Sequence, residues 1–339
     1  MKKAAWFLAA AASAVLAGCG RNSFAELAAA RNLSTGTAVA VGDLFQPEHI
    51  EIIRENSSIV VAENCMKLGS VRPSRSLWNW GDADSLVEFA EKNKIAVKYH
   101  TLVWHNQNPP FVSGMQTEEE ARSMLDECIS TVMSRYKGRI REYDVVNEMF
   151  NEDGSLRNSV WLRTAGSGYI EYALRRAREA DPDALLFLNE YNNEAEGNPK
   201  ADAMYRFVKQ LKEQGVPVDG VGMQLHLDAT LPFSPDAIRS NVRRYADIGV
   251  KVSFSEVDVR IPSGSPEKWE QRQQEVYEAL LRIALEEPNV TSFITWGFTD
   301  SQSWVPQAFP GYGNALLYDA DKNPKPVYES LVRILREKK

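Results

Sequence analysis

Eight short β-rich runs alternate with amphipathic helical stretches along this chain of 339 residues. The runs are apolar and rich in β-branched residues over most of their length, as is typical of strands buried on both faces of a sheet. Such strands pair in parallel when a helix connects each one to the next. We predict strands at residues 35–41, 58–63, 95–104, 142–148, 184–189, 218–226, 250–257 and 291–297.

Helices are predicted between and after these strands, at residues 47–55, 82–93, 117–136, 169–180, 200–214, 234–248, 266–287 and 326–336. Thr117 followed three residues later by Glu120 has the pattern of a capping box, which marks a helix start. Gly215 and Gly249 follow two of the predicted helices, and glycine commonly ends a helix.

Eight β/α units are the number that closes into a barrel, and about 300 residues suffice for one. We therefore predict an α/β fold, a (β/α)8 TIM barrel, in a single domain over residues 25–339. An open, doubly wound sheet is the alternative. Against it, no glycine-rich phosphate loop follows the first strand, as that fold would require for a nucleotide.

The N-terminus has the features of a segment that directs export and is then removed. Lys2 and Lys3 precede an apolar run at residues 4–17, which is too short to span a bilayer. The sequence Leu16-Ala17-Gly18-Cys19 resembles a bacterial lipoprotein signal. We predict a signal peptide at residues 1–18, lipidation of Cys19 and a short linker at residues 19–24.

This N-terminus predicts an exported protein that a lipid anchors to the bacterial membrane. Gly20 rather than Asp follows the cysteine, which leaves transport to the outer membrane or cell surface open, and we expect the protein there. The alternative is a plain secretory signal and a secreted or periplasmic protein.

Charge and cysteine content exclude several classes of partner. The net charge is −7, from 39 Lys and Arg against 46 Asp and Glu, so nucleic acid is not an expected partner. Cys65 and Cys128 lack the spacing of a zinc site, and we expect two buried free thiols, with a disulfide as the alternative. We expect no metal, no cofactor and a monomer.

Polar and aromatic residues gather at the ends of the predicted strands. The active site of a (β/α)8 barrel lies at the carboxyl ends of its strands. Three of the four histidines (His100, His105 and His226) are in these segments. Histidines with only structural roles would rarely cluster in this way. We therefore expect a catalytic site at this end of the barrel.

Two glutamates at these strand ends match the chemistry of glycoside cleavage. Glu148 ends the fourth strand and Glu256 lies near the end of the seventh, on opposite sides of the barrel mouth. Glycoside hydrolysis uses two carboxyl groups, one that protonates the leaving oxygen and one that attacks or activates water. The alternative, ion pairing with Lys or Arg at the rim, is disfavoured because Asn, Gln, His and Trp surround each Glu.

Several motifs together resemble glycoside hydrolase family 10, the endo-β-1,4-xylanases, from about residue 25 to the C-terminus. They are Trp104-His-Asn-Gln107, Asp144-Val-Val-Asn-Glu148, Gly222-Met-Gln-Leu-His226, Ser255-Glu-Val-Asp258, Trp296-Gly-Phe-Thr-Asp-Ser-Gln-Ser-Trp304 and Asn323-Pro-Lys-Pro-Val-Tyr328. The resemblance implies a retaining endo-1,4-β-xylanase that cleaves internal bonds of xylan and xylo-oligosaccharides through a covalent glycosyl-enzyme intermediate.

The resemblance also implies roles for individual residues. Glu148 matches the acid/base and Glu256 the nucleophile, while His226 and Asp258 match the residues that orient the nucleophile. The positions that match substrate-binding residues are Glu63, Asn64, Lys67, His100, Trp104, Gln107, Asn147, Asn189, Gln224, Trp296 and Trp304. Trp78 and Trp80 match no catalytic position, and we interpret them as structural.

Three positions depart from the family pattern. Tyr99 replaces a usual Gly, residues 108–111 replace the usual Leu-Pro-x-Trp, and Glu190 replaces a usual Asp near the acid/base. Two other functions remain open: a β-1,4-glucanase or cellulase on the same barrel, and a non-catalytic glycan-binding lipoprotein on the cell surface. The presence of both Glu148 and Glu256 argues against the second.

Overall fold

Eight parallel strands close into a barrel in this computed structural model, which describes residues 22–337. They are β1 (Ser34–Val39), β2 (Ile59–Ala62), β3 (Ala96–Trp104), β4 (Glu142–Asn147), β5 (Leu185–Glu190), β6 (Gly220–Met223), β8 (Lys251–Pro262) and β9 (Val290–Thr295). Strand β9 pairs in parallel with β1, which completes the circle. The predicted (β/α)8 barrel in one domain is confirmed. The predicted signal peptide and Cys19 lie outside the described residues.

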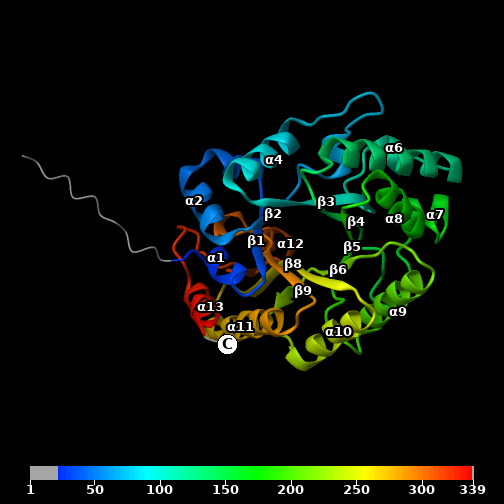
Figure 1. Cartoon of the computed structure of the whole chain (residues 1–339). Coiled ribbons are helices and arrows are strands. Elements are labelled where there is room, and N and C mark those ends of the chain that lie inside the picture. The colour runs from blue at the N-terminus through cyan, green and yellow to red at the C-terminus, as the bar shows by residue number, and fades with distance from the viewer. Residues whose placement is uncertain (1–21, 338–339) are drawn as a thin grey trace, which may run out of the picture.

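Helices surround the barrel, as Figure 1 shows. Each predicted helix is present, and most begin and end within two residues of the predicted bounds. They are α2 (Pro47–Asn56), α4 (Gly81–Asn93), α6 (Glu118–Tyr136), α8 (Tyr169–Ala180), α9 (Pro199–Glu213), α10 (Pro235–Asp247), α11 (Glu270–Glu286) and α13 (Pro326–Arg336). Thr117 and Glu120 form the predicted capping box. The last-but-one helix begins later than predicted, because residues Pro266–Lys268 form a separate 3₁₀ turn.

Short elements are the main additions to the prediction. They are helices α1 (Phe24–Ala29), α3 (Leu68–Val71), α5 (Pro110–Ser113), α7 (Val160–Ala165) and α12 (Val305–Ala308), and strands β7 (His226–Asp228) and β10 (Tyr312–Gly313). One- or two-turn helices are too short to show a helical period. Helix α1 begins at the last residue of the predicted linker, and the Phe24 ring stacks on Tyr328 of α13.

Strand β8 is longer than predicted, and this extension shapes the site. It continues past residue 257 to Pro262, because β7 and β10 pair with its far end. The predicted strand at residues 218–226 is interrupted at Leu225, whose φ of 61° lies in the left-handed region. His226 therefore begins a separate short strand, β7, which pairs with the extension of β8.

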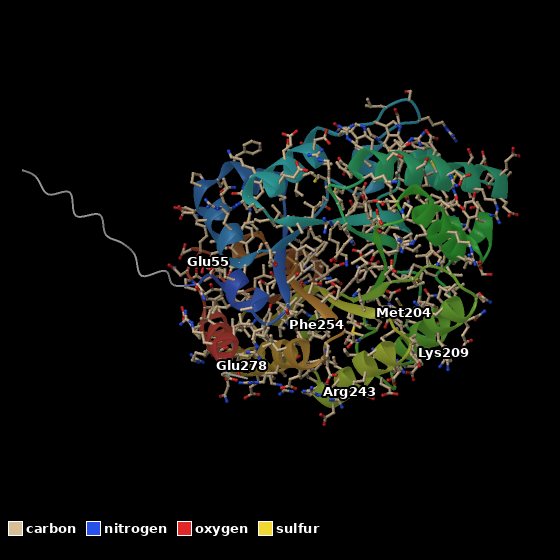
Figure 2. All side chains as sticks on the ribbon, in the orientation of Figure 1. Glu55, Met204, Lys209, Arg243, Phe254 and Glu278 are labelled. Carbon is tan, nitrogen blue, oxygen red and sulfur yellow. The ribbon has the colours of Figure 1, made fainter. Side chains whose placement is uncertain are left out.

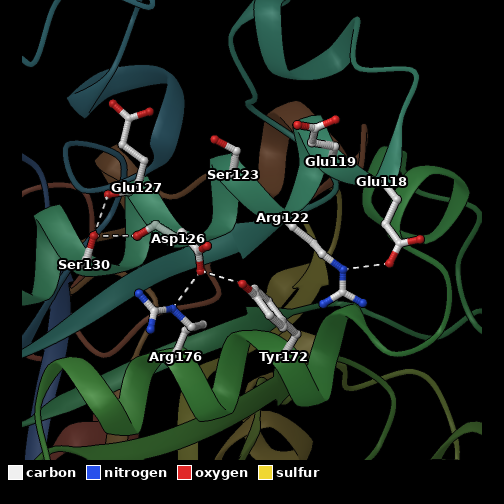
Figure 3. Close-up of a pocket in the computed structure, with 9 residues that line it drawn as sticks. All are labelled: Glu118, Glu119, Arg122, Ser123, Asp126, Glu127, Ser130, Tyr172 and Arg176. Carbon is white, nitrogen blue, oxygen red and sulfur yellow. Dashed lines mark hydrogen bonds and ion pairs between the residues drawn. The ribbon is translucent and has the colours of Figure 1, made fainter.

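Figure 2 shows the side chains on this framework, and most of the buried apolar ones form one large core. Phe254 on β8 and Met204 on α9 are both fully buried. On the outer surface, a groove follows α6 and α8 (Figure 3). Several of its polar residues pair with each other: Asp126 accepts from the Tyr172 hydroxyl at 2.7 Å and pairs with Arg176 at 2.7 Å. Within residues 22–337, none of the helices is long and apolar enough to cross a membrane.

Candidate active site

A cleft of about 700 Å³ opens at the carboxyl ends of the strands. Twelve of the predicted site residues line it: Glu63, Asn64, Lys67, His100, Trp104, Gln107, Glu148, Gln224, His226, Glu256, Trp296 and Trp304. Asn147, Asn189 and Asp258 are buried just behind the wall of the cleft. The barrel therefore brings together residues from seven of its strands or the loops that follow them.

Glu256 is held firmly by two neighbours. Its Oε1 accepts a hydrogen bond of 2.7 Å from the side-chain amide of Asn189, and its Oε2 accepts one of 3.2 Å from Nε2 of His226. The other ring nitrogen of His226 donates to Asp258 at 2.9 Å. Asp258 also accepts a 2.8 Å hydrogen bond from the indole of Trp304. This chain fixes both the direction and the charge of the imidazole.

The charges of this group favour an ionised Glu256. Burial lowers the pKa of His226, but Asp258 and Glu256 outweigh it and raise that pKa to about 10. Burial raises the pKa of Glu256, whereas the hydrogen bond from His226 and the charge of His100 lower it, and the net shift is downward. An imidazolium beside a carboxylate that is already ionised suits a nucleophile.

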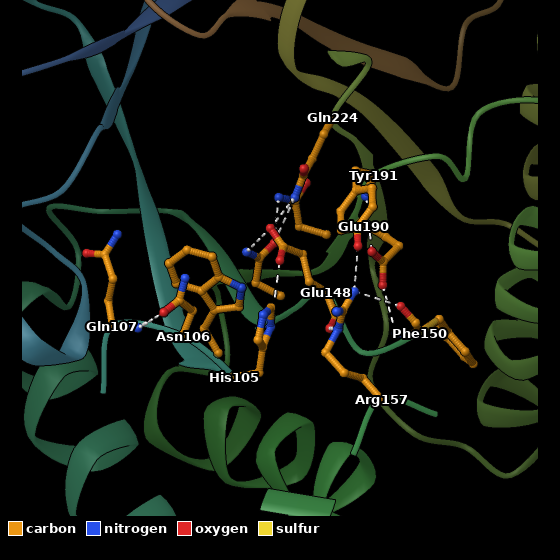
Figure 4. Close-up of polar contacts among 12 residues, drawn as sticks. His105, Asn106, Gln107, Glu148, Phe150, Arg157, Glu190, Tyr191 and Gln224 are labelled. Atoms are coloured by element: carbon orange, nitrogen blue, oxygen red, sulfur yellow. Dashed lines mark hydrogen bonds and ion pairs between the residues drawn. The ribbon is translucent and has the colours of Figure 1, made fainter. Parts of the chain in front are cut away.

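Glu148 faces the same cleft with weaker contacts (Figure 4). Its Oε1 accepts hydrogen bonds of 3.3 Å from each of the amides of Asn147 and Gln224. Nδ1 of His105 lies 3.6 Å from its Oε2. These contacts are longer than those of Glu256, so the Glu148 carboxyl group is held less tightly.

A chain of amides connects the two carboxylates. The Asn189 side chain donates to Oδ1 of Asn147 at 2.9 Å, and Gln224 donates to the same atom at 3.2 Å. Since Asn189 also contacts Glu256, and Gln224 also contacts Glu148, the arrangement of one glutamate depends on that of the other.

The part of the cleft near β2 combines a lysine with two indoles. Lys67 Nζ donates to Asn64 at 3.1 Å and lies 4.9 Å from the ring centre of Trp104 and 5.8 Å from that of Trp296. Burial lowers the pKa of Lys67, against the effect of Glu256. Flat aromatic faces beside a few polar groups are typical of carbohydrate sites.

His100 is oriented from behind by a buried carboxylate. Its Nδ1 lies 3.0 Å from Oδ2 of Asp144, whose other oxygen pairs with Lys98 at 2.9 Å. The neighbouring Tyr99 points to the opposite face of β3 and packs on Tyr143 at 5.7 Å. This departure from the family pattern therefore does not reach the cleft.

Six residues that line the cleft were missing from the sequence prediction: Asn106, Tyr191, Asn192, Arg260, Gln307 and Phe309. Arg260 lies on the unpredicted extension of β8, and its guanidinium stacks 4.0 Å from the ring centre of Phe309. His105 was noted without a role and contacts Glu148. Asn106, Tyr191 and Asn192 lie close in sequence to predicted site residues, and this proximity could have identified them as candidates.

The remaining expectations outside the cleft concern thiols and tryptophans. Cys65 and Cys128 are both free, as expected, although Cys65 is only partly buried. Trp78 and Trp80 stack on each other at 4.9 Å. Arg72 covers Trp78 and Arg135 covers Trp80, so these rings pack against protein groups, in agreement with a structural role.

Comparisons with known proteins agree with this geometry. The family model described as glycosyl hydrolase family 10 matches residues 23–334. The chain is 41% identical over 293 residues to endo-1,4-beta-xylanase B of Thermotoga neapolitana, covering 86% of this chain and 84% of the relative.

Solved structures give the same result. Native xylanase 10B from Thermotoga maritima has a TM-score of 0.89 and 43% identity, and the match covers 92% of this chain and 98% of that one. Xylanase 10B from Thermotoga petrophila RKU-1, in complex with xylobiose, has a TM-score of 0.90 and 42% identity, with 93% and 98% covered.

Proposed function

The chain belongs to glycosyl hydrolase family 10 and is therefore a glycoside hydrolase, and we propose that it is a retaining endo-1,4-β-xylanase. The observation that carries the proposal is the unequal setting of two carboxyl groups in one cleft. Glu256 is ionised, and hydrogen bonds from Asn189 and His226 hold it in place. Glu148 accepts hydrogen bonds at its Oε1 from the neutral side-chain amides of Asn147 and Gln224.

In the first step, Glu256 attacks the anomeric carbon and Glu148 gives its proton to the departing glycosidic oxygen. The bond to the leaving sugar breaks, and a glycosyl ester on Glu256 forms with inversion. The His226 imidazolium keeps the attacking carboxylate ionised and aimed. Asn147, next to the acid/base, donates to Glu148 Oε1 at 3.3 Å and so helps to orient it.

In the second step, the ionised Glu148 takes a proton from a water molecule, and that water attacks the same carbon. The ester bond breaks, Glu256 leaves as a carboxylate, and a second inversion restores the original β configuration. Each residue ends the cycle in its starting protonation state, so this cycle needs no cofactor.

Xylan is the proposed substrate because the named relatives are xylanases and one solved relative holds xylobiose. A β-1,4-glucan would present an extra hydroxymethyl group at C5 of each sugar. The test is parallel measurement of reducing-sugar release from xylan and from carboxymethylcellulose. Preferential release from xylan is expected. Greater release from carboxymethylcellulose would assign the glucanase alternative, and no release from either would favour a glycan-binding protein.

We also propose that the protein acts from a membrane surface. The support is the sequence Leu16-Ala17-Gly18-Cys19, which would leave Cys19 as the lipid-bearing first residue of the mature chain. A short linker then leads to α1, which begins at Phe24. Anchored in this way, the enzyme would degrade xylan at the outer membrane or cell surface as a monomer.

A further inference from the structure

A buried ion pair behind Glu148 takes no part in the mechanism above. Glu190 ends β5 and Lys200 lies in the first turn of α9, and neither side chain is exposed. Their Oε1 and Nζ atoms are 2.9 Å apart. Nζ also lies 3.2 Å from the ring centre of Tyr191. Taking two charges out of water is costly, so stability alone is a weak reason for such a pair.

The second oxygen of Glu190 contacts the backbone just after Glu148 (Figure 4). Glu190 Oε2 accepts a hydrogen bond of 2.9 Å from the backbone N–H of Phe150. From the other side, Arg157 donates to the backbone oxygen of Glu148 at 2.9 Å and to that of Phe150 at 3.0 Å. Hydrogen bonds from Glu190 and Arg157 thus hold the backbone of the segment from Glu148 to Phe150.

This segment needs external support because of its backbone conformation. Glu148 has a φ of 55°, in the left-handed region that residues other than glycine adopt at an energetic cost. Such a conformation persists only where the surrounding structure imposes it. The Glu190 carboxylate can hold Phe150 only if its own direction is set, and Lys200 at 2.9 Å sets it together with the backbone N–H of Tyr191 at 3.1 Å.

We propose that Glu190 and Lys200 are positioning residues for the acid/base, holding the Phe150 amide so that the Glu148 carboxyl group faces the leaving oxygen. The proposal rests on the proposed function, since it concerns the proton that Glu148 delivers. Glutamate, one methylene longer than the usual aspartate, spans from Lys200 to Phe150 with its two oxygens.

Misplacing a general acid slows only those reactions that need its proton. Phenyl β-xylobioside has a poor leaving group and requires protonation, whereas dinitrophenyl β-xylobioside does not. A loss of packing or folded protein would slow both substrates alike. The ratio of the two kcat/KM values therefore separates positioning from a structural role, because kcat/KM reports the first bond cleavage.

The variants are Lys200→Met, Glu190→Gln and the double variant. Each single change should lower kcat/KM for the phenyl substrate about 10²-fold, as expected for displacement by roughly 1 Å, and leave the dinitrophenyl value near wild type. The double variant should lose no more than Lys200→Met alone, since the two residues act as one unit. Glu190→Gln keeps the size and shape of the side chain, so it still tests the positioning role if Lys200→Met does not fold.

Lys98→Met is the matched control, because Lys98 is also fully buried and pairs at 2.9 Å with a buried carboxylate, Asp144. Its loss should be the same for both substrates. The proposal would be overturned if Lys200→Met and Glu190→Gln each lowered kcat/KM by the same factor for the phenyl and the dinitrophenyl substrate, or if neither variant lowered it for the phenyl substrate. A wild-type protein that cleaves neither xylobioside would instead contradict the proposed function.

Discussion

The side-chain amide of Asn189 on β5 donates a 2.7 Å hydrogen bond to Oε1 of Glu256 on β8, past the intervening strand β6. The backbone oxygen of Asn189 accepts from the N–H of Glu148 at 2.9 Å. Asn189 thus contacts the carboxylate of Glu256 and the backbone of Glu148. A displacement of Asn189 should therefore disturb catalysis more than it disturbs folding.

Gly222→Ala tests this relationship. A Cβ at Gly222 would lie 1.9 Å from Oδ1 of Asn189 and 3.1 Å from Oγ of Ser255, so the Asn189 side chain must move. We expect kcat on xylohexaose to fall by about 10²-fold, the usual effect of misplacing a reacting group by roughly 1 Å. Gly264→Ala, where a Cβ meets nothing within 4 Å, is the control and should keep its activity. Full activity in Gly222→Ala would refute the prediction.

Glu148→Ala should separate the two chemical steps. With dinitrophenyl β-xylobioside, the glycosyl-enzyme should form at a near-normal rate and then accumulate, because no base activates water. Azide is an anion that needs no base, so it should restore turnover and yield a β-glycosyl azide, measured by steady-state kinetics and NMR. Glu256→Ala should show no such rescue with this substrate. Rescue of Glu256→Ala through an α-azide would mean that the roles are reversed.

Retention predicts the stereochemistry of the first product. Proton NMR of xylohexaose hydrolysis should detect the β-anomer first, followed by slow mutarotation to the mixture. The carboxyl groups of retaining enzymes are about 5–5.5 Å apart, which leaves no room for a water between sugar and nucleophile. Initial appearance of the α-anomer would contradict the double displacement.

His226 should make stability depend on pH in the alkaline range. Its pKa is raised from an ordinary 6.5 to about 10 in the folded protein by Asp258 and Glu256, against the opposing effect of burial. The contribution of its charge to the free energy of unfolding is fully present below pH 6.5 and is lost as the pH rises through about 10.

Urea unfolding of wild type and His226→Gln at several pH values measures this contribution. The difference in the free energy of unfolding between the two proteins should be largest near neutral or lower pH and shrink toward pH 10. A difference that stays constant or grows with pH would show that His226 is neutral in the folded protein.

Cys19→Ser tests the proposed anchor. The wild-type protein, expressed in a bacterium that processes lipoproteins, should partition with the membrane fraction, because an acylated cysteine supplies the hydrophobic attachment. The variant should shift to the soluble fraction with its xylan-degrading activity intact. A soluble wild type whose mature N-terminus is not residue 19 would show that the signal is an ordinary secretory one.

The barrel was predictable because its determinants are local. Each buried strand is a short apolar run, each long helix has a helical period, and eight such units leave few architectures. Glu148, Glu256 and His226 could be chosen for the same reason. A barrel gathers the carboxyl ends of its strands, so polar residues at those positions must face one cleft.

The interactions among those residues could not be predicted in this way. Arg260 lines the cleft only because β7 and β10 pair with the far end of β8 and extend it. Lys200 on α9 pairs with Glu190 at the end of β5, ten residues earlier in the chain. The raised pKa of His226 depends on its burial beside Asp258 and Glu256. The local hydrophobic pattern and the order of the strands are enough to predict the fold and to select the proposed reacting groups. The charges and orientations of these groups follow only from the folded structure, because they depend on burial and on contacts between residues that are distant along the chain.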